Sequence, residues 1–216
     1  HMISVSSNAA ASIVWRELVL MRAFGNKYPI TEDEANNYFK NTPKKELSNI
    51  AVSIVNDPLR KLGITESDWR LGSLFTSEAK KIIPGSGGSA ATPKGLMKFL
   101  VAMERGKIVD ELSSLEMKRI LYLTDKRIRY ASTKSLVNAA VYFKSGSFYK
   151  CKKEENFVCK KYSGNVENFM NSVVIVEHPD GTTYMVTLMS NVLRKNSNVD
   201  HMSLAAQIDK IIRKAK

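Results

Sequence analysis

The feature that most constrains the fold is a pair of apolar segments on either side of the turn sequence His178-Pro-Asp-Gly181. Residues 172–176 are almost continuously apolar, which is typical of a strand buried on both faces. Residues 182–189 follow the turn and predict its antiparallel partner, because Pro-Asp-Gly supplies the backbone conformations of a tight connection. Residues 141–151 predict a further strand, so the sequence favours a three-stranded antiparallel sheet.

Helical periodicity dominates the chain before residue 139 and returns after the strands. Asn8 is a candidate cap for a helix over 9–22, and Thr31 with Glu34 forms a capping-box pattern before a short helix to residue 39. Ser113 and Glu116 form a second such pattern. The remaining predicted helices cover 44–56, 93–105, 113–123 and 200–214. A helical region, three strands and a terminal helix together indicate an α+β fold, with at least one sheet edge left open.

Composition narrows the classes of protein that this chain can represent. Hydrophobic residues make up 44% of the 216 positions, which is too many for a disordered chain. The apolar runs are too short to cross a bilayer, so we expect no transmembrane segment. The net charge of +12 favours anionic partners, but the basic residues are scattered and no nucleic-acid motif is present. We therefore expect a solvated basic surface and no nucleic-acid partner.

The two cysteines, Cys151 and Cys159, flank residues 152–158, which could form a hairpin tip. Cross-strand neighbours there can meet disulfide geometry, and a disulfide would imply an oxidising compartment. Two buried free thiols are the alternative. A zinc site needs about four ligands, and the three histidines do not cluster with these cysteines in the sequence. We expect neither a metal ion nor another cofactor.

Three short motifs stand in a particular order along the chain. Ser6-Ser7-Asn8 precedes the first predicted helix, Thr92-Pro93 opens a later one, and Lys144-Ser145-Gly146 lies on the first predicted strand. This arrangement resembles serine β-lactamases and penicillin-binding D,D-peptidases, which carry Ser-x-x-Lys, then Ser-x-Asn, then Lys-Thr/Ser-Gly. Residues 96–100 resemble the helix that follows the active-site loop in class A enzymes. Residues 127–131, 140–146 and 193–197 are similar to stretches of proteobacterial serine hydrolases.

The resemblance implies a role for each motif residue. Ser6 would relay a proton to the leaving nitrogen, and Asn8 would orient the substrate amide and the lysine beside the nucleophile. Lys144 would supply a positive field, Ser145 would bind a substrate carboxylate, and the backbone N–H of Ser147 would be an oxyanion donor. Gly146 would complete this substrate-binding strand. The structural alternatives are a serine that caps a helix and a lysine exposed on a strand.

The expected nucleophile motif is absent from its place before Ser6. Ser77-Glu-Ala-Lys80 and Ser147-Phe-Tyr-Lys150 match Ser-x-x-Lys, but both follow the Ser-x-Asn motif and are in the wrong order. Glu46 is the nearest candidate for a general base, with a helix-surface glutamate as the alternative. The resemblance thus implies a β-lactamase/transpeptidase-like antiparallel sheet flanked by helices, without its N-terminal strands and nucleophile helix. Residues 1–2 resemble a cloning remnant, and 3–216 the C-terminal part of one serine-hydrolase domain.

The resemblance implies acyl transfer on an amide, lactam or ester, with β-lactams or peptidoglycan-like peptides as small-molecule or peptide substrates. We expect a periplasmic or exported parent protein and no turnover by this chain without its nucleophile. The missing N-terminal segment or a second copy would cover the open sheet edge. One alternative is a non-catalytic module that binds a cell-wall ligand or a protein partner. Another is an anion-binding basic protein unrelated to hydrolysis, whose binding would weaken with salt.

Overall fold

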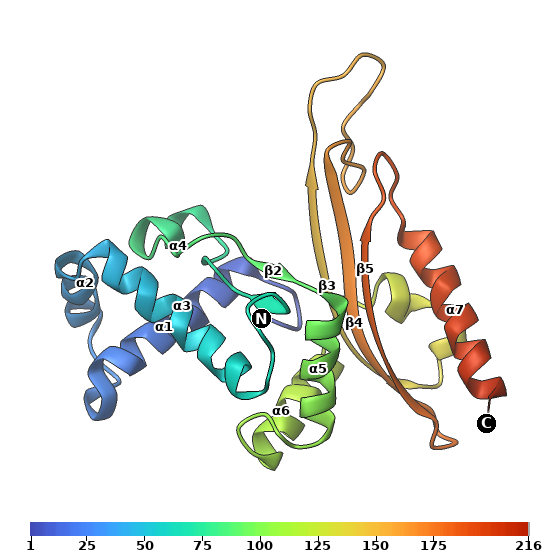
Figure 1. The fold of residues 1–216 in the computed structure, drawn as a ribbon, viewed down its shortest axis with the longest axis horizontal. Helices are drawn as coiled ribbons and strands as arrows, with labels where there is room; N and C mark the ends of the chain where they lie inside the picture. The colour runs from blue at the N-terminus through green and yellow to red at the C-terminus, as the bar shows by residue number, and fades with distance from the viewer. Residues whose placement is uncertain (216) are drawn as a thin grey trace. The chain divides into compact units, whose positions relative to one another are not determined.

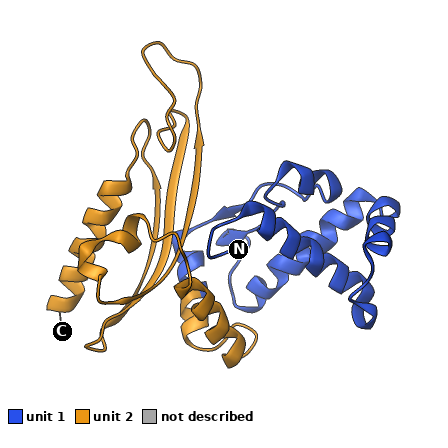
Figure 2. Ribbon diagram, turned by 180° about the vertical axis from the view of Figure 1, so that it is seen from behind, with its two compact units in different colours: residues 1–99 blue, residues 100–216 orange. Residues whose placement is uncertain are grey.

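The computed structural model describes residues 1–215, which form two compact units that divide after Phe99 (Figure 2). Helix α5 (Pro93–Glu104) begins in the first unit and ends in the second. No helix within residues 1–215 has both the length and the apolar character needed to cross a membrane.

The first unit is mainly helical, as its apolar periodicity predicts (Figure 1). Its elements are α1 (Asn8–Phe24), η1 (Gly25–Lys27), α2 (Glu32–Asn41), α3 (Lys44–Lys61), β1 (Trp69–Arg70), α4 (Ser77–Ile82) and β2 (Ala90–Ala91). The two short strands pair antiparallel, Trp69 with Ala91. They were not predicted, because two residues are too few to show a strand period.

The core of this unit joins α1, α2 and α3. Trp15, Val19 and Leu20 of α1 pack with Phe39 of α2 and Leu47 of α3. The indole Nε1 of Trp15 donates to the carbonyl of Ala51 over 2.8 Å, so the ring is both buried and hydrogen-bonded. The core therefore fixes the orientation of α1, the helix that follows the Ser-x-Asn motif.

Helix starts were predicted with mixed success. The capping box of Thr31 and Glu34 is confirmed. The prediction that Asn8 caps α1 is wrong, because the hydroxyl of Ser7 accepts from the backbone N–H of Ala10 and Asn8 is the first helical residue. Helix α3 continues to Lys61 through Pro58, beyond its predicted end at residue 56. Burial of the Leu59 side chain stabilises the last turn of α3.

The second unit contains a three-stranded antiparallel sheet in the order β3–β4–β5. Its elements after α5 are α6 (Glu111–Tyr122), η2 (Arg129–Ser132), η3 (Lys134–Leu136), β3 (Ala140–Lys150), β4 (Glu167–Glu177), β5 (Thr183–Asn191) and α7 (Asn198–Lys214). The register pairs Ala140 with Glu177 and Glu177 with Thr183. The α+β fold predicted from the sequence is confirmed.

Helix α7 covers one face of this sheet (Figure 1). Ala205 of α7 belongs to a core that also contains side chains from all three strands and from η2 and η3. The buried members of this core are Tyr130, Ala131, Leu136, Ala139, Val141, Phe143, Val174, Val176, Tyr184 and Ala205. Residues 172 and 174–176 of β4 are all buried, as expected for a central strand, and Val173 is half-buried. Within the described sheet β3 and β5 each pair on one side only.

Three details of the second unit bear on the predictions. The tight turn after β4 is confirmed, since His178 N–H donates to Thr182 over 2.9 Å and Gly181 has φ +82°. Strand β4 starts at Glu167, earlier than predicted, because its polar residues pair with β3 in register. The capping box of Ser113 and Glu116 is wrong, since the carboxylate of Asp110 caps α6 by accepting from Ser113 N–H over 2.6 Å.

Candidate active site

The Ser-x-Asn motif lies at the start of α1 in the first unit. Ser6 is half-buried and has a left-handed backbone with φ +58°, which is uncommon for a residue with a side chain. Such conformations occur often at functional sites. Ser7 caps the helix, so the exposed side chain of Asn8 is not needed for capping and stands at the first helical position. The turn thus presents Ser6 and Asn8 on either side of a structural serine.

The Lys-Ser-Gly motif lies on β3, an edge strand of the sheet in the second unit. On such an edge, alternate backbone N–H and C=O groups point away from the neighbouring strand. A Cβ atom added to Gly146 would meet nothing within 4 Å, so a ligand has room to approach this strand. The half-buried Lys144 donates from Nζ to the carbonyl of Ser145. The motif therefore combines an open backbone edge with a cation.

Lys144 lies in a positively charged environment. Burial, followed by the charges of Lys126 and Arg129, lowers the pKa of Lys144 from its ordinary value. Like charges and desolvation both destabilise its ammonium form, so an anion bound there would be favoured. The Nε2 atom of His201 in α7 lies 3.0 Å from the hydroxyl of Ser190 in β5. Burial and the charge of Arg129 lower the pKa of His201, so the positive field at neutral pH comes from the lysines and the arginine.

Arg129 is the residue that sequence reasoning missed. It is 1% exposed, has φ +54°, and its guanidinium donates to Gly146 O over 3.0 Å and to the hydroxyl of Ser147. The guanidinium carbon also lies 5.5 Å from the centre of the Tyr162 ring. Burial lowers the pKa of Arg129, but a guanidinium remains charged at neutral pH. Its only sequence signal was its place in the family-like stretch 127–131.

The other candidate residues fall outside this cluster. Ser77 and Lys80 are both exposed in the short helix α4, and no hydrogen bond joins them among the described residues. The hydroxyl of Ser147 is bound by Arg129, which does not favour a role as nucleophile. Glu46 is exposed in the first turn of α3, where a carboxylate is favourable beside the helix N-terminus.

The structure joins Cys151 and Cys159 in a disulfide with their Cα atoms 6.1 Å apart. No three His, Cys, Asp or Glu side chains within residues 1–215 are grouped closely enough to hold a metal ion. The second unit therefore brings Lys144, residues 145–147 and Arg129 together, while Ser6 and Asn8 belong to the first unit.

Comparison with solved structures supports the resemblance at the level of the fold. The β-lactamase of Sphaerobacter thermophilus is 16% identical with a TM-score of 0.56, and 97% of this chain covers 60% of that one. The TLA-3 extended-spectrum β-lactamase is 13% identical with a TM-score of 0.60, and the match covers 98% of this chain and 62% of TLA-3. A mutant of the penicillin-binding protein PBP-A, solved as an acyl-enzyme with penicillin G, is 12% identical with a TM-score of 0.53. That match covers 96% of this chain and 82% of PBP-A. The chain thus spans about three fifths of the first two relatives.

No curated protein sequence is significantly similar to this chain. A model of the β-lactamase enzyme family, in contrast, matches residues 1–215, nearly the whole sequence. The match agrees with the antiparallel sheet flanked by helices. The chain belongs to the β-lactamase enzyme family.

Proposed function

We propose that this chain is the C-terminal part of a serine-hydrolase domain that acts by acyl transfer on an amide, lactam or ester. The observation that carries the proposal is that Lys144 binds the carbonyl of Ser145, while Arg129 binds Gly146 and the Ser147 hydroxyl, on an open strand edge. A β-lactam or a wall peptide carries a carboxylate beside an acyl group. Positive charge at the site would hold that carboxylate and stabilise charge that develops during the reaction.

Each site residue has a proposed part in this chemistry. Lys144 supplies positive potential on the motif strand, the hydroxyl of Ser6 relays a proton to the leaving nitrogen, and Asn8 orients the substrate amide. Ser145 binds the substrate carboxylate, and Ser147 donates its backbone N–H to the oxyanion. Arg129 orients the strand by binding Gly146 and the Ser147 side chain. The nucleophile would come from a Ser-x-x-Lys segment upstream of Ser6.

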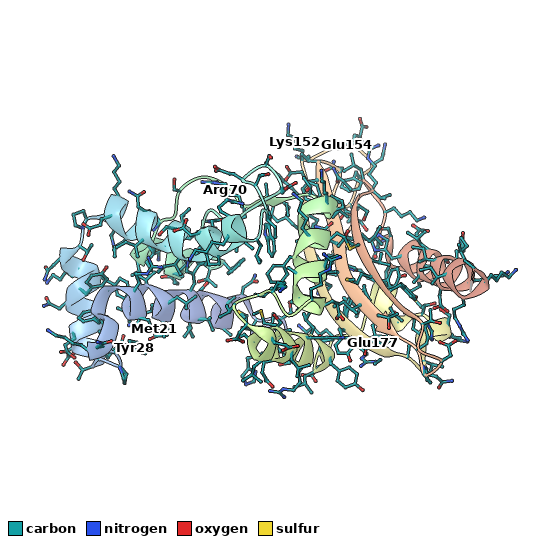
Figure 3. The ribbon with its side chains drawn as sticks, turned by 60° about the horizontal axis from the view of Figure 1, so that its bottom comes forward. Met21, Tyr28, Arg70, Lys152, Glu154 and Glu177 are labelled. Atoms are coloured by element: carbon teal, nitrogen blue, oxygen red, sulfur yellow. A yellow bond between two sulfur atoms is a disulfide. The ribbon has the colours of Figure 1, made fainter. Side chains whose placement is uncertain are left out.

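An exposed apolar face on α1 supports the proposal of an upstream segment. Ile13, Val14, Leu18 and Met21 are 37–59% exposed on the helix, although its other face is buried (Met21 is labelled in Figure 3). A helix that is apolar on both faces is normally buried on both. The upstream segment would cover this face and a free edge of the sheet. A second copy of the chain is the alternative, and light scattering after gel filtration would reveal it as a dimer.

The intact mass of the protein after incubation with a penicillin and with a fluorophosphonate tests the acyl-transfer proposal. We expect an adduct on a chain extended upstream through a Ser-x-x-Lys motif and none on residues 1–216. An adduct on the shorter chain would refute the proposed position of the nucleophile and direct attention to Ser77. If neither chain reacts, the domain is a binding module for a cell-wall ligand or a protein partner.

The extended chain also tests the assignment of Lys144. We expect Lys144→Ala to abolish acylation without unfolding the protein, and the matched control Lys134→Ala to acylate at the rate of the parent. An unchanged rate in Lys144→Ala would refute the site. A periplasmic or exported location is proposed on the basis of the Cys151–Cys159 disulfide, because disulfides persist in oxidising compartments.

A further inference from the structure

The connection between β3 and β4 is a long basic hairpin end at the far side of the strand that carries the Lys-Ser-Gly motif. It comprises residues 151–166 and extends past the end of β5 in the second unit (Figure 1). Hairpin connections usually have about two to five residues, and connections as long as residues 151–166 are commonly functional. The acyl-transfer proposal gives this segment no role.

The segment is ordered by its own contacts. The disulfide of Cys151 and Cys159 closes its tip. Below the disulfide, the Asn165 side chain accepts from the backbone N–H of Lys152 over 2.9 Å and donates to its carbonyl over 3.0 Å. A Cβ on Gly164 would lie 2.1 Å from the carbonyl of Glu167, so the chain packs too closely there for any other residue. The tip is therefore built as a defined structure.

A second set of contacts anchors the tip to the end of β5. Arg194 donates its backbone N–H to Gly164 O over 2.8 Å, and its guanidinium pairs with Glu154 at 2.6 Å. Lys152 and Glu154 of this tip are labelled in Figure 3. One of the two acidic residues of the tip is thus neutralised by Arg194, and Glu155 is the other.

The charge that remains on the tip is positive and solvent-exposed. The hairpin carries five exposed lysines: Lys150, Lys152, Lys153, Lys160 and Lys161. The ammonium groups of Lys152, Lys153 and Lys160 have no hydrogen-bond or ion-pair partner among residues 1–215. Clustered charges that a protein does not neutralise itself attract ligands of the opposite sign.

Aromatic rings lie along the hairpin next to these lysines. Phe148 and Phe169 are register partners whose rings stack with centroids 6.5 Å apart, and Phe148 is 54% exposed. Tyr149, one residue on and therefore on the other face, packs against Tyr162 with centroids 6.0 Å apart. Flat apolar rings beside lysines suit a ligand that alternates apolar ring faces with anionic groups.

We propose that this hairpin, residues 148–169, is a docking surface for an anionic glycan polymer. Carboxylate or phosphate groups of the polymer meet the exposed lysines, and the apolar faces of its sugar rings stack on Phe148 and Phe169. The disulfide favours an extracellular glycan over a nucleic acid, because it belongs to an oxidising compartment. A lipid surface is disfavoured, since Val158 is the one strongly exposed aliphatic side chain of the described tip. The proposal concerns binding and does not depend on acyl transfer.

Titration calorimetry of the whole chain with sodium polygalacturonate and with a phosphomannan tests the proposal. The test variant changes Lys152, Lys153, Lys160 and Lys161 to Gln. The control variant changes Lys40, Lys45, Lys61 and Lys80 to Gln, which lie exposed in the first unit, so both variants lose the same net charge. The two polymers distinguish a carboxylate from a phosphate ligand, and Phe148→Ala tests ring stacking.

We expect the test variant to bind at least one polymer about ten-fold more weakly and to show a smaller salt dependence. The control variant should stay within about two-fold of the parent chain, and Phe148→Ala should bind several-fold more weakly. Equal losses in both variants, or no binding of either polymer by the parent chain, would overturn the proposal. Tighter binding to phosphatidylglycerol vesicles or to duplex DNA, lost in the test variant alone, would assign the surface to a lipid or a nucleic acid instead.

Discussion

Replacement of Lys118 by Met tests the ion cluster that joins α5, α6 and the sheet in the second unit. The ammonium of Lys118 lies 2.8 Å from Glu104 and 2.5 Å from Glu177, and the hydroxyl of Tyr142 donates to Glu177 over 2.7 Å. The Lys118 side chain is only 15% exposed. Methionine preserves most of its apolar stem, so the variant removes the charge and leaves two carboxylates without their cation.

The expected loss follows from the degree of burial. Removing one partner of a fully buried ion pair costs about 3–5 kcal/mol. The carboxylates here are 21% and 33% exposed, so solvent screens part of the uncompensated charge. We expect Lys118→Met to lower the free energy of unfolding by about 2 kcal/mol, which corresponds to a fall of about 1 M in the urea midpoint.

The pH dependence gives the prediction its sign. Burial alone would raise the pKa of Glu177, but hydrogen bonds from Lys118 and Tyr142 hold it below its ordinary value of 4.5. Its contribution to stability is therefore present above that value and is lost as pH falls through the folded-state pKa. The pKa of Lys118 is raised against the opposing effect of burial, because its ammonium binds Glu104 and Glu177. That contribution is present below pH 10.5 and is lost as pH rises through the folded-state value.

Without Lys118, burial acts to raise the pKa of Glu177 with one lowering partner fewer, so the variant gains stability relative to the parent as this carboxylate becomes protonated. The difference between the two proteins should thus be largest at neutral pH and should shrink below pH 4.5. Urea unfolding is followed by far-UV circular dichroism, since Trp15 and Trp69 both lie in the first unit. The exposed Lys107→Met is the matched control and should change stability by less than about 0.5 kcal/mol. A loss below that limit in Lys118→Met, or one independent of pH, would refute the reasoning.

Three further substitutions test other contacts. Asp209→Ala should lower the free energy of unfolding by about 2–4 kcal/mol, because the buried carboxylate accepts from Tyr184 over 3.0 Å and contacts His178 at 2.7 Å. Calorimetry measures the resulting fall in melting temperature, and an unchanged melting temperature would contradict this assignment. Leu47→Ala should cost about 2–5 kcal/mol by opening a cavity in the first core, visible in urea unfolding monitored by tryptophan fluorescence, and a loss below 1 kcal/mol would show that the core collapses around it. Thr31→Ala should cost about 1 kcal/mol in the same assay through loss of the capping box, whereas Thr31→Ser should retain most of the stability.

The sequence by itself determined the features that depend on neighbouring residues. The turn at 178–181 and the capping box at Thr31 were predicted correctly because their hydrogen bonds connect residues within five positions. The apolar run of β4 was predicted as a strand buried on both faces because such burial leaves no polar alternation. The order of the motifs likewise indicated the β-lactamase family before any contact was known.

Local signals also produced the errors, since several residues compete for the same local role. Ser7 and Asn8 are both good cap residues, as are Asp110 and Ser113, and the backbone geometry at each helix entry decides between them. Pro58 is a frequent helix terminator, but burial of Leu59 stabilises the turn that contains it. These choices depend on packing that the local sequence does not describe.

Only the tertiary structure decided which distant residues meet. Arg129 reads as one of many cations in a basic chain, yet the fold buries it beneath Gly146 and Ser147, residues 17 and 18 positions away. The contact between Asp209 and His178 likewise links a helix to a turn 31 positions earlier. Short-range periodicity and capping specify elements, whereas a buried polar group takes whichever partner the packed elements place within hydrogen-bond distance. The motif strand could therefore be found in the sequence, but the guanidinium that supports it could be found only in the fold.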